Sequence, residues 1–148
     1  MYGGSDRTRY EVVAGDYATA SVEAVQAAAE GARSELGAAQ RLGSGFPRVV
    51  VEIVRIDERS IGVLAASSET PLARGSEIVV VGRARVVESE SAAALIDTGD
   101  VSRAAQFAAG ETPSSDSAAR ARAVRDAARD VGRALGRSVL GLPVPAEG

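Results

Sequence analysis

The segment Arg48-Val49-Val50-Val51-Glu52-Ile53-Val54-Arg55-Ile56, which follows Pro47, sets the character of the fold. It is rich in β-branched residues and nearly continuous in hydrophobicity, a pattern typical of a strand covered on both faces. The polar residues Asp57-Glu58-Arg59-Ser60 come next and form either a turn or a bulge, and the apolar run Ile61–Ala65 follows them. We therefore expect a sheet that grows outward from this segment, with an extra hairpin if the polar residues form a turn.

Downstream, the segment Glu77–Val87 follows an expected loop at residues 67–76 and alternates as a strand does. One face carries Ile78, Val80, Gly82, Ala84 and Val86, and the other carries Val79, Val81, Arg83 and Arg85. This alternation predicts a strand with one buried face and one face that tolerates charge.

Three shorter segments complete the expected sheet. Arg9–Ala14 reads as a short strand near the start of the chain, and Ala93–Ile96 and Val101–Ala108 read as strands separated by a tight turn or bulge at Asp97–Asp100. The last of these segments would place Val101, Arg103, Ala105 and Phe107 on one side.

Two segments show helical periodicity. In Tyr17–Leu42, with Asp16 as the expected N-cap, apolar residues recur every three or four positions. They are Ala18, Val22, Val25, Ala29, Ala32, Leu36 and Ala39. Gly31 and Gly37 are costly inside a helix, so we expect both to allow another element to come close.

The final helix is expected to start near Ser114, Ser115 or Asp116 and to run to about Leu142. Its predicted buried stripe is Val124, Ala128, Val131, Leu135, Val139 and Leu142. Pro143 and Pro145 follow, and proline cannot continue a helix.

Together these segments predict an α+β fold in the order β-α-β-β-β-α. We expect a two-layer sandwich, with two helices packed on one face of a mostly antiparallel sheet of about four strands. Residues 1–7 are expected to be a flexible lead-in, residues 8–142 a single domain, and residues 143–148 a C-terminal tail.

Composition excludes several classes of function. The 148 residues include no Cys and no His, which argues against thiol chemistry, imidazole acid–base catalysis and most zinc sites. All 17 basic residues are arginines, and the net charge of -3 argues against a nucleic-acid partner. No apolar run is long enough to span a bilayer. The sequence shows no nucleophile beside a base and no phosphate-binding glycine loop. We therefore expect that the protein is not an enzyme and binds no cofactor.

Two acidic motifs have both a chemical and an ordinary interpretation. Asp97-Thr98-Gly99 spells the aspartic-protease tripeptide, but that chemistry needs a second carboxylate sharing a proton, and Asp-Gly turns are common. Asp97 and Asp100, with Glu88 and Glu90, could hold a hard cation, although solvated carboxylates explain the pattern equally.

Arginines supply the remaining candidates. The final helix carries an arginine stripe that is partly neutralised by Asp126 and Asp130, which favours a solvated face; the stripe is Arg122, Arg125, Arg129, Arg133 and Arg137. Arg83, Arg85 and Arg103 are expected to project from adjacent strands on the face opposite the helices, with few acids between them. Such a patch would suit a lipid phosphate or a sugar acid, and ordinary outward arginines are the alternative.

The layout of the chain resembles the LptE family, the outer-membrane lipoproteins that partner the LptD barrel in lipopolysaccharide assembly. The resemblance covers roughly residues 2–142 and rests on several features together. These are the start Tyr2-Gly3-Gly4, the short strand Tyr10–Ala14, the strand Val49–Leu64 with its polar middle, Arg74-Gly75 before Gly82-Arg83-Ala84-Arg85-Val86, Asp97–Val101, and Ala127–Leu135 in the last helix.

The resemblance implies a non-catalytic plug or chaperone in the lumen of an LptD-like outer-membrane β-barrel, in contact with lipopolysaccharide. It also implies a protein on the periplasmic face of the outer membrane of a Gram-negative bacterium, held by a lipid anchor on a Cys preceding Tyr2. Arg83, Arg85 and Arg103 would then contact lipopolysaccharide phosphates. The alternative is a periplasmic adaptor lipoprotein of a lipid ABC transporter or secretion system.

Overall fold

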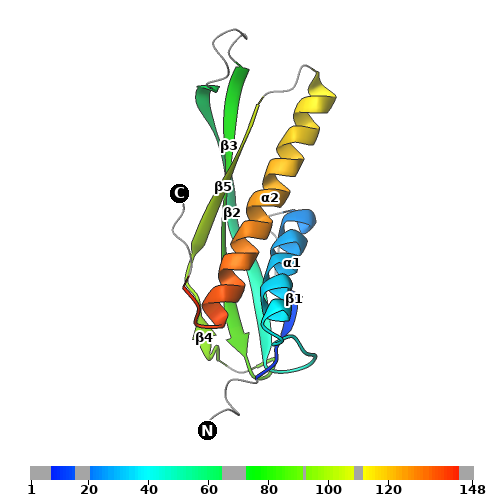
Figure 1. Ribbon diagram of the computed structural model, residues 1–148, viewed down its shortest axis with the longest axis vertical. Coiled ribbons are helices and arrows are strands. Elements are labelled where there is room, and N and C mark those ends of the chain that lie inside the picture. Colours follow the sequence, from blue (N-terminus) through cyan, green and yellow to red (C-terminus); the bar gives the residue numbers. More distant parts are fainter. Residues whose placement is uncertain (1–7, 16–20, 65–72, 92, 109–111, 144–148) are drawn as a thin grey trace.

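The computed structural model describes residues 8–15, 21–64, 73–91, 93–108 and 112–143 (Figure 1). Its centre is a long antiparallel pair of strands, β2 (Arg48–Leu64) and β3 (Ala73–Val87). The pairing shifts register between Ile53 and Arg55 and again between Ser60 and Gly62. The polar residues 57–60 therefore stay within β2 between two irregularities, so of the two alternatives the turn with its extra hairpin is wrong.

Over the described residues the sheet has five strands, and one of their pairings is parallel. β1 (Glu11–Ala14) lies parallel to β2, and both β4 (Ile96–Asp97) and β5 (Val101–Ala108) lie antiparallel to β3. The predicted α+β class and mostly antiparallel sheet are confirmed. The expected strand Ala93–Ile96 is wrong in extent, because only the two-residue β4 joins the sheet. The expected loop at 67–76 is also too long, since β3 begins at Ala73.

Both helices, α1 (Val22–Ala38) and α2 (Pro113–Val139), lie on the same face of the sheet and run in the same direction (Figure 1). Each is shorter than the periodicity predicted. The hydroxyl of Ser21 accepts from the Ala24 N–H at 3.1 Å and caps α1, in place of the expected Asp16, which lies outside the described residues. The start of a helix is fixed by hydrogen bonds from a capping side chain, and the spacing of apolar residues contains no information about these bonds.

The cap of α2 also differs from the prediction. Thr112 is the N-cap and Pro113 the first helical residue, and Thr112 and Ser115 exchange side-chain and backbone hydrogen bonds as a capping box. The helix ends at Val139, so Leu142 lies beyond it and is exposed rather than part of the buried stripe.

Small residues let the two helices touch along their backbones. A Cβ atom added at Gly132 would lie 1.8 Å from the Ala28 carbonyl oxygen, and one at Gly31 would lie 2.2 Å from that of Arg129. The close approach expected at Gly31 is confirmed. At Gly37 it is wrong, because the nearest atom to such a Cβ is a Leu42 methyl at 4.0 Å.

The core lies between the helices and the sheet face that they cover. That face carries the buried residues Val49, Val51, Ile53, Ile78, Val80, Ala84 and Val86, so the predicted inward face of β3 is confirmed. Val50 and Val54 of β2 are only half-buried, and no described helix lies on their side of the sheet (Figure 1). The expectation that this strand is covered on both faces is therefore wrong for the described residues.

Neither helix of the described chain has the length and apolar character needed to cross a membrane.

Candidate functional site

The open face of the sheet carries a group of four charged side chains from three strands: Glu52, Arg83, Arg85 and Asp97. Glu52 lies opposite Arg83 in the register of β2 and β3, and Asp97 lies opposite Arg85 in that of β3 and β4. Paired residues of antiparallel strands share a face, so these four side chains meet on one surface. We call them the charge cluster.

The ion pairs within the charge cluster run diagonally. Arg83 Nη2 lies 2.7 Å from Asp97 Oδ2, and Arg85 Nε lies 3.3 Å from Glu52 Oε1. Arg83 thus pairs with the carboxylate that lies opposite Arg85, and Arg85 pairs with the carboxylate that lies opposite Arg83. The prediction that these arginines have few acids between them is wrong, because each is matched by a carboxylate.

Asp97 is the most constrained member of the charge cluster. Its Oδ1 accepts from the Gly99 N–H at 2.9 Å while its Oδ2 faces Arg83. The Gly99 N–H, and then the Arg83 guanidinium, hold the pKa of this carboxyl below its ordinary value. In return, the hydrogen bond and charge of Asp97 raise the pKa of Arg83. Both side chains are consequently charged at physiological pH.

The Asp97-Thr98-Gly99 motif forms a turn. Thr98 Oγ1 accepts from the Ala84 N–H at 3.0 Å, and the Thr98 N–H donates to the Ala84 carbonyl at 3.0 Å. Gly99 has φ of 72°, a conformation that glycine adopts readily. These bonds tie the turn to β3, which matches the ordinary interpretation of the motif.

The candidate cation ligands do not converge. Among the described residues, no group of three or more His, Cys, Asp or Glu side chains is close enough to hold a metal ion. Asp97, Asp100, Glu88 and Glu90 therefore do not form a common ligand set in this structure.

Arg103 does not join Arg83 and Arg85. It pairs with Val80 in the register of β3 and β5, and Val80 is buried under the helices. Arg103 therefore faces the helix side of the sheet, whereas Arg83 and Arg85 face the open side. The predicted three-arginine patch is wrong, because the alternation within each strand does not fix which of its faces meets the helices.

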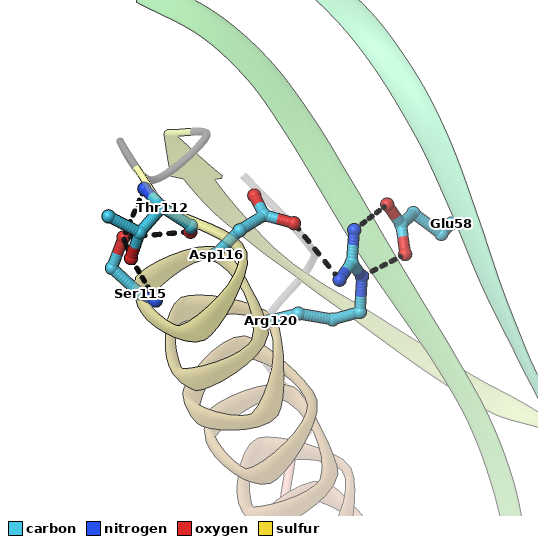
Figure 2. Close-up of polar contacts among 5 residues, drawn as sticks. All are labelled: Glu58, Thr112, Ser115, Asp116 and Arg120. Carbon is cyan, nitrogen blue, oxygen red and sulfur yellow. Dashed lines mark hydrogen bonds and ion pairs between the residues drawn. The ribbon is translucent and has the colours of Figure 1, made fainter.

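A second polar group joins β2 to α2, and the sequence interpretation missed it (Figure 2). Arg120 Nε and Nη2 donate to the two oxygens of Glu58 at 2.7 and 3.2 Å, and Arg120 Nη1 lies 3.1 Å from Asp116 Oδ2. The Glu58 carboxylate is the main cause of the raised pKa of Arg120. The Arg120 guanidinium also lies 5.6 Å from the centre of the Phe107 ring. This contact fixes the first turns of α2 against the sheet.

The bulge in β2 makes the Arg120 contact available. Ile53 faces the helices. In a regular strand Arg55 and Asp57 would face the helices as well, because side chains alternate. The register shift after Ile53 instead turns Ile56 and Glu58 toward the helices. The sequence offered only the polar run at Asp57–Ser60 as a signal.

The arginine stripe of α2 divides between contacts and solvent. Arg129 and Arg137 reach Glu30 and Glu35 of α1 at 3.5 Å in both cases. Arg122, Arg125 and Arg133 are exposed. Part of the stripe therefore helps to hold the helix pair together.

An open hollow of about 280 Å³ lies between the first turn of α1 and the start of α2. Glu23, Arg120 and Arg125 are its charged lining residues, and its surface is mainly apolar. Arg120 is already bound to Glu58 and Asp116, and Glu23 is the one carboxylate in the lining. Among the described lining residues the hollow thus holds a single carboxylate together with two arginines.

Solved structures share this fold at low sequence identity. The "putative lipoprotein" from Caulobacter crescentus CB15 superposes with a TM-score of 0.61 at 13% identity, over 93% of this chain and 91% of that one. A minor lipoprotein from Acinetobacter baumannii gives a TM-score of 0.54 at 9% identity, over 91% and 94% of the two chains. Rare lipoprotein B from Shewanella oneidensis gives 0.51 at 9% identity, over 90% and 95%.

No protein-family model and no curated protein matches the sequence. The structural likenesses span nearly the whole of each chain, so the shared feature is the complete arrangement of helices and sheet rather than a common motif.

Proposed function

We propose that this chain is the globular domain of an outer-membrane lipoprotein of the LptE type, which acts as a plug or chaperone for an LptD-like β-barrel in lipopolysaccharide assembly. The observation that carries the proposal is the likeness over 93% of the chain to a bacterial protein described as a lipoprotein. Two further lipoproteins share the fold, and the sequence layout resembles the same family.

The physical features of the domain support a role in binding rather than in catalysis. One sheet face is sealed by the helices, and the other presents half-buried valines and paired charges. Such a face, apolar at its middle with charges around it, suits a large partner surface. In this proposal the half-buried valines of the open face lie against the barrel wall.

Arg83 and Arg85 are the groups through which lipopolysaccharide would be contacted in this proposal. Both are partly exposed, with side-chain exposure of 40% each. A phosphate would replace Asp97 and Glu52 as their partner, because a guanidinium binds phosphate through the same forked donors. Arg103 has no part in this contact, since it faces the helix side.

The test is capture of the barrel. The affinity-tagged full chain is produced together with the LptD-like protein of its own organism and purified from outer-membrane extracts. We expect the barrel to co-purify in equal amount. Val79→Glu, which adds a charge to the open face, should reduce the yield, and the control Ala118→Glu, on an exposed part of α2, should not.

Two results would overturn the barrel proposal. One is the absence of any barrel from a well-folded wild-type preparation. The other is capture of an inner-membrane transporter in its place, which would favour the adaptor alternative. A precursor without a Cys before Tyr2 would separately remove the lipid anchor.

A further inference from the structure

Exposed large hydrophobic side chains gather at one end of the molecule. Five are exposed among the described residues: Val22, Phe46, Leu95, Ile96 and Leu142. Their exposed fractions are 38% to 59%, and four of the five lie in β4 or in the segments just before β2, just before β4 and just after α2. Val22, in the first turn of α1, is the exception.

The segments that carry these four residues lie at the same end of the molecule. Phe46 stands just before β2, whose first residue pairs with the last residue of β3. Ile96 pairs with Val86 at this same end of β3, and Leu142 follows the end of α2. Both helices also end here (Figure 1). We call this the lower end, comprising the described residues 40–48, 88–91, 93–97 and 140–143.

The arginines of the lower end lie alongside apolar groups. The Arg48 guanidinium sits 4.3 Å from the centre of the Phe46 ring while it binds Glu11 at 3.0 Å. The Arg41 guanidinium lies 5.6 Å from the Tyr10 ring. Guanidinium groups beside aromatic and aliphatic side chains suit a boundary between apolar and aqueous phases, where the charge stays in the polar layer.

The opposing charges at this end limit any purely electrostatic attraction. Glu88 and Glu90 are exposed in the turn after β3, and Glu11 is bound to Arg48. The apolar side chains are therefore the main attractive feature, and they stand on three separate segments of the chain. The hollow beside α1 lies away from this end, at the helix start.

We propose that the lower end rests on a lipid bilayer surface, with Phe46, Leu95 and Leu142 entering the boundary between headgroups and acyl chains. The chain reaches this end from its N-terminal side, because the Tyr10 N–H donates to the Arg41 carbonyl at 2.9 Å. A lipid anchor before Thr8 would hold the same end toward the bilayer; this last step rests on the proposed function.

The test uses tryptophan as a reporter, since the sequence contains none. Phe46→Trp, Leu142→Trp and the control Val22→Trp are made singly in the full chain. An added N-terminal polyhistidine tag tethers each variant to vesicles of phosphatidylethanolamine, phosphatidylglycerol and a nickel-chelating lipid. The tether replaces any native anchor, so the result does not depend on whether the protein is a lipoprotein.

We expect the emission of the Phe46→Trp and Leu142→Trp variants to shift to shorter wavelength on the vesicles and to be quenched by lipids with brominated acyl chains. The Val22→Trp variant should show neither effect. Leu95→Ser in the Phe46→Trp background should reduce the quenching, because one inserted side chain is lost.

Equal quenching of all three tryptophans, or quenching of none, would overturn the inference. So would an emission shift that grows with protein concentration in the absence of lipid, since this would identify the lower end as a contact between copies of the chain. Loss of the lipoprotein assignment would instead leave a positive vesicle result intact.

Discussion

The two faces of strand β3 show how one stretch of sequence serves two different purposes. Toward the helices, Val80, Gly82 and Ala84 are buried, and a Cβ added at Gly82 would lie 2.7 Å from a methyl group of Val131 in α2. On the open side, Arg83 and Arg85 hold their carboxylate partners in half-exposed positions. The covered face is a close-packed contact, whereas the open face retains charges that packing does not require.

This contrast separates the residues that stabilise the protein from those available for binding. The core is built largely from alanine and valine. Its stability therefore depends on the helices and the sheet lying close together rather than on the burial of large side chains. Changes on the helix side should therefore affect the free energy of unfolding, and changes on the open side should affect binding.

Val131→Asp should have the strongest effect of all. Val131 has no exposed surface and packs over Gly82, so the new carboxylate would be buried without a partner. Such a change costs about 4 kcal/mol or more, a large part of the stability of a typical domain. We expect loss of the cooperative thermal transition in circular dichroism. A soluble variant with a normal melting curve would show that this side of α2 is not packed as described.

Next in size is a comparison of two glycines inside helices. Gly132→Ala places a methyl group where the Ala28 backbone lies, and the helices must separate, at a cost of about 3 kcal/mol or more. Gly37→Ala has open space and should stabilise the protein by up to about 1 kcal/mol. Urea denaturation measures both values. Equal effects of the two substitutions would contradict the backbone contact between α1 and α2.

A weaker effect, on binding alone, is expected on the open face. Arg83→Gln with Arg85→Gln removes two positive charges and should weaken binding of purified lipopolysaccharide several-fold while the melting temperature changes little, because exposed ion pairs contribute little to stability. The control, Arg122→Gln with Arg133→Gln, removes the same charge from the exposed face of α2. An equal loss of binding in both would mean that net charge, and not the charge cluster, governs the interaction.

The smallest expected effect is the change with pH of the difference in melting temperature between the wild-type protein and Asp97→Asn. The pKa of Asp97 is lowered in the folded protein from its ordinary value of 3.8, so its stabilising contribution is complete above that pH and disappears as the pH falls through the lower, folded value. The wild-type protein should exceed Asp97→Asn in melting temperature at neutral pH, and the difference should shrink below about pH 4. A difference that persists in strong acid would exclude ionisation of Asp97 as its source.

Local patterns in the sequence were enough to predict the class of the fold and the inward face of β3. Alternation from Ile78 to Val86 and three-to-four spacing from Val124 to Val139 each report directly which residues can be buried together. The close contact between the helices was also partly visible in Gly31. The lack of Cys and His in the sequence limits the available chemistry in any fold.

How those elements meet depended on the tertiary structure. Arg103 alternates as predicted within its strand, but its pairing with Val80 turns it toward the helices, and a shift of one residue in register would have reversed this. The bulge after Ile53 likewise brings Glu58 to Arg120 across 62 positions of sequence. Register and bulges depend on contacts between distant segments, so the charge cluster that replaces the predicted patch follows from packing rather than from any local pattern.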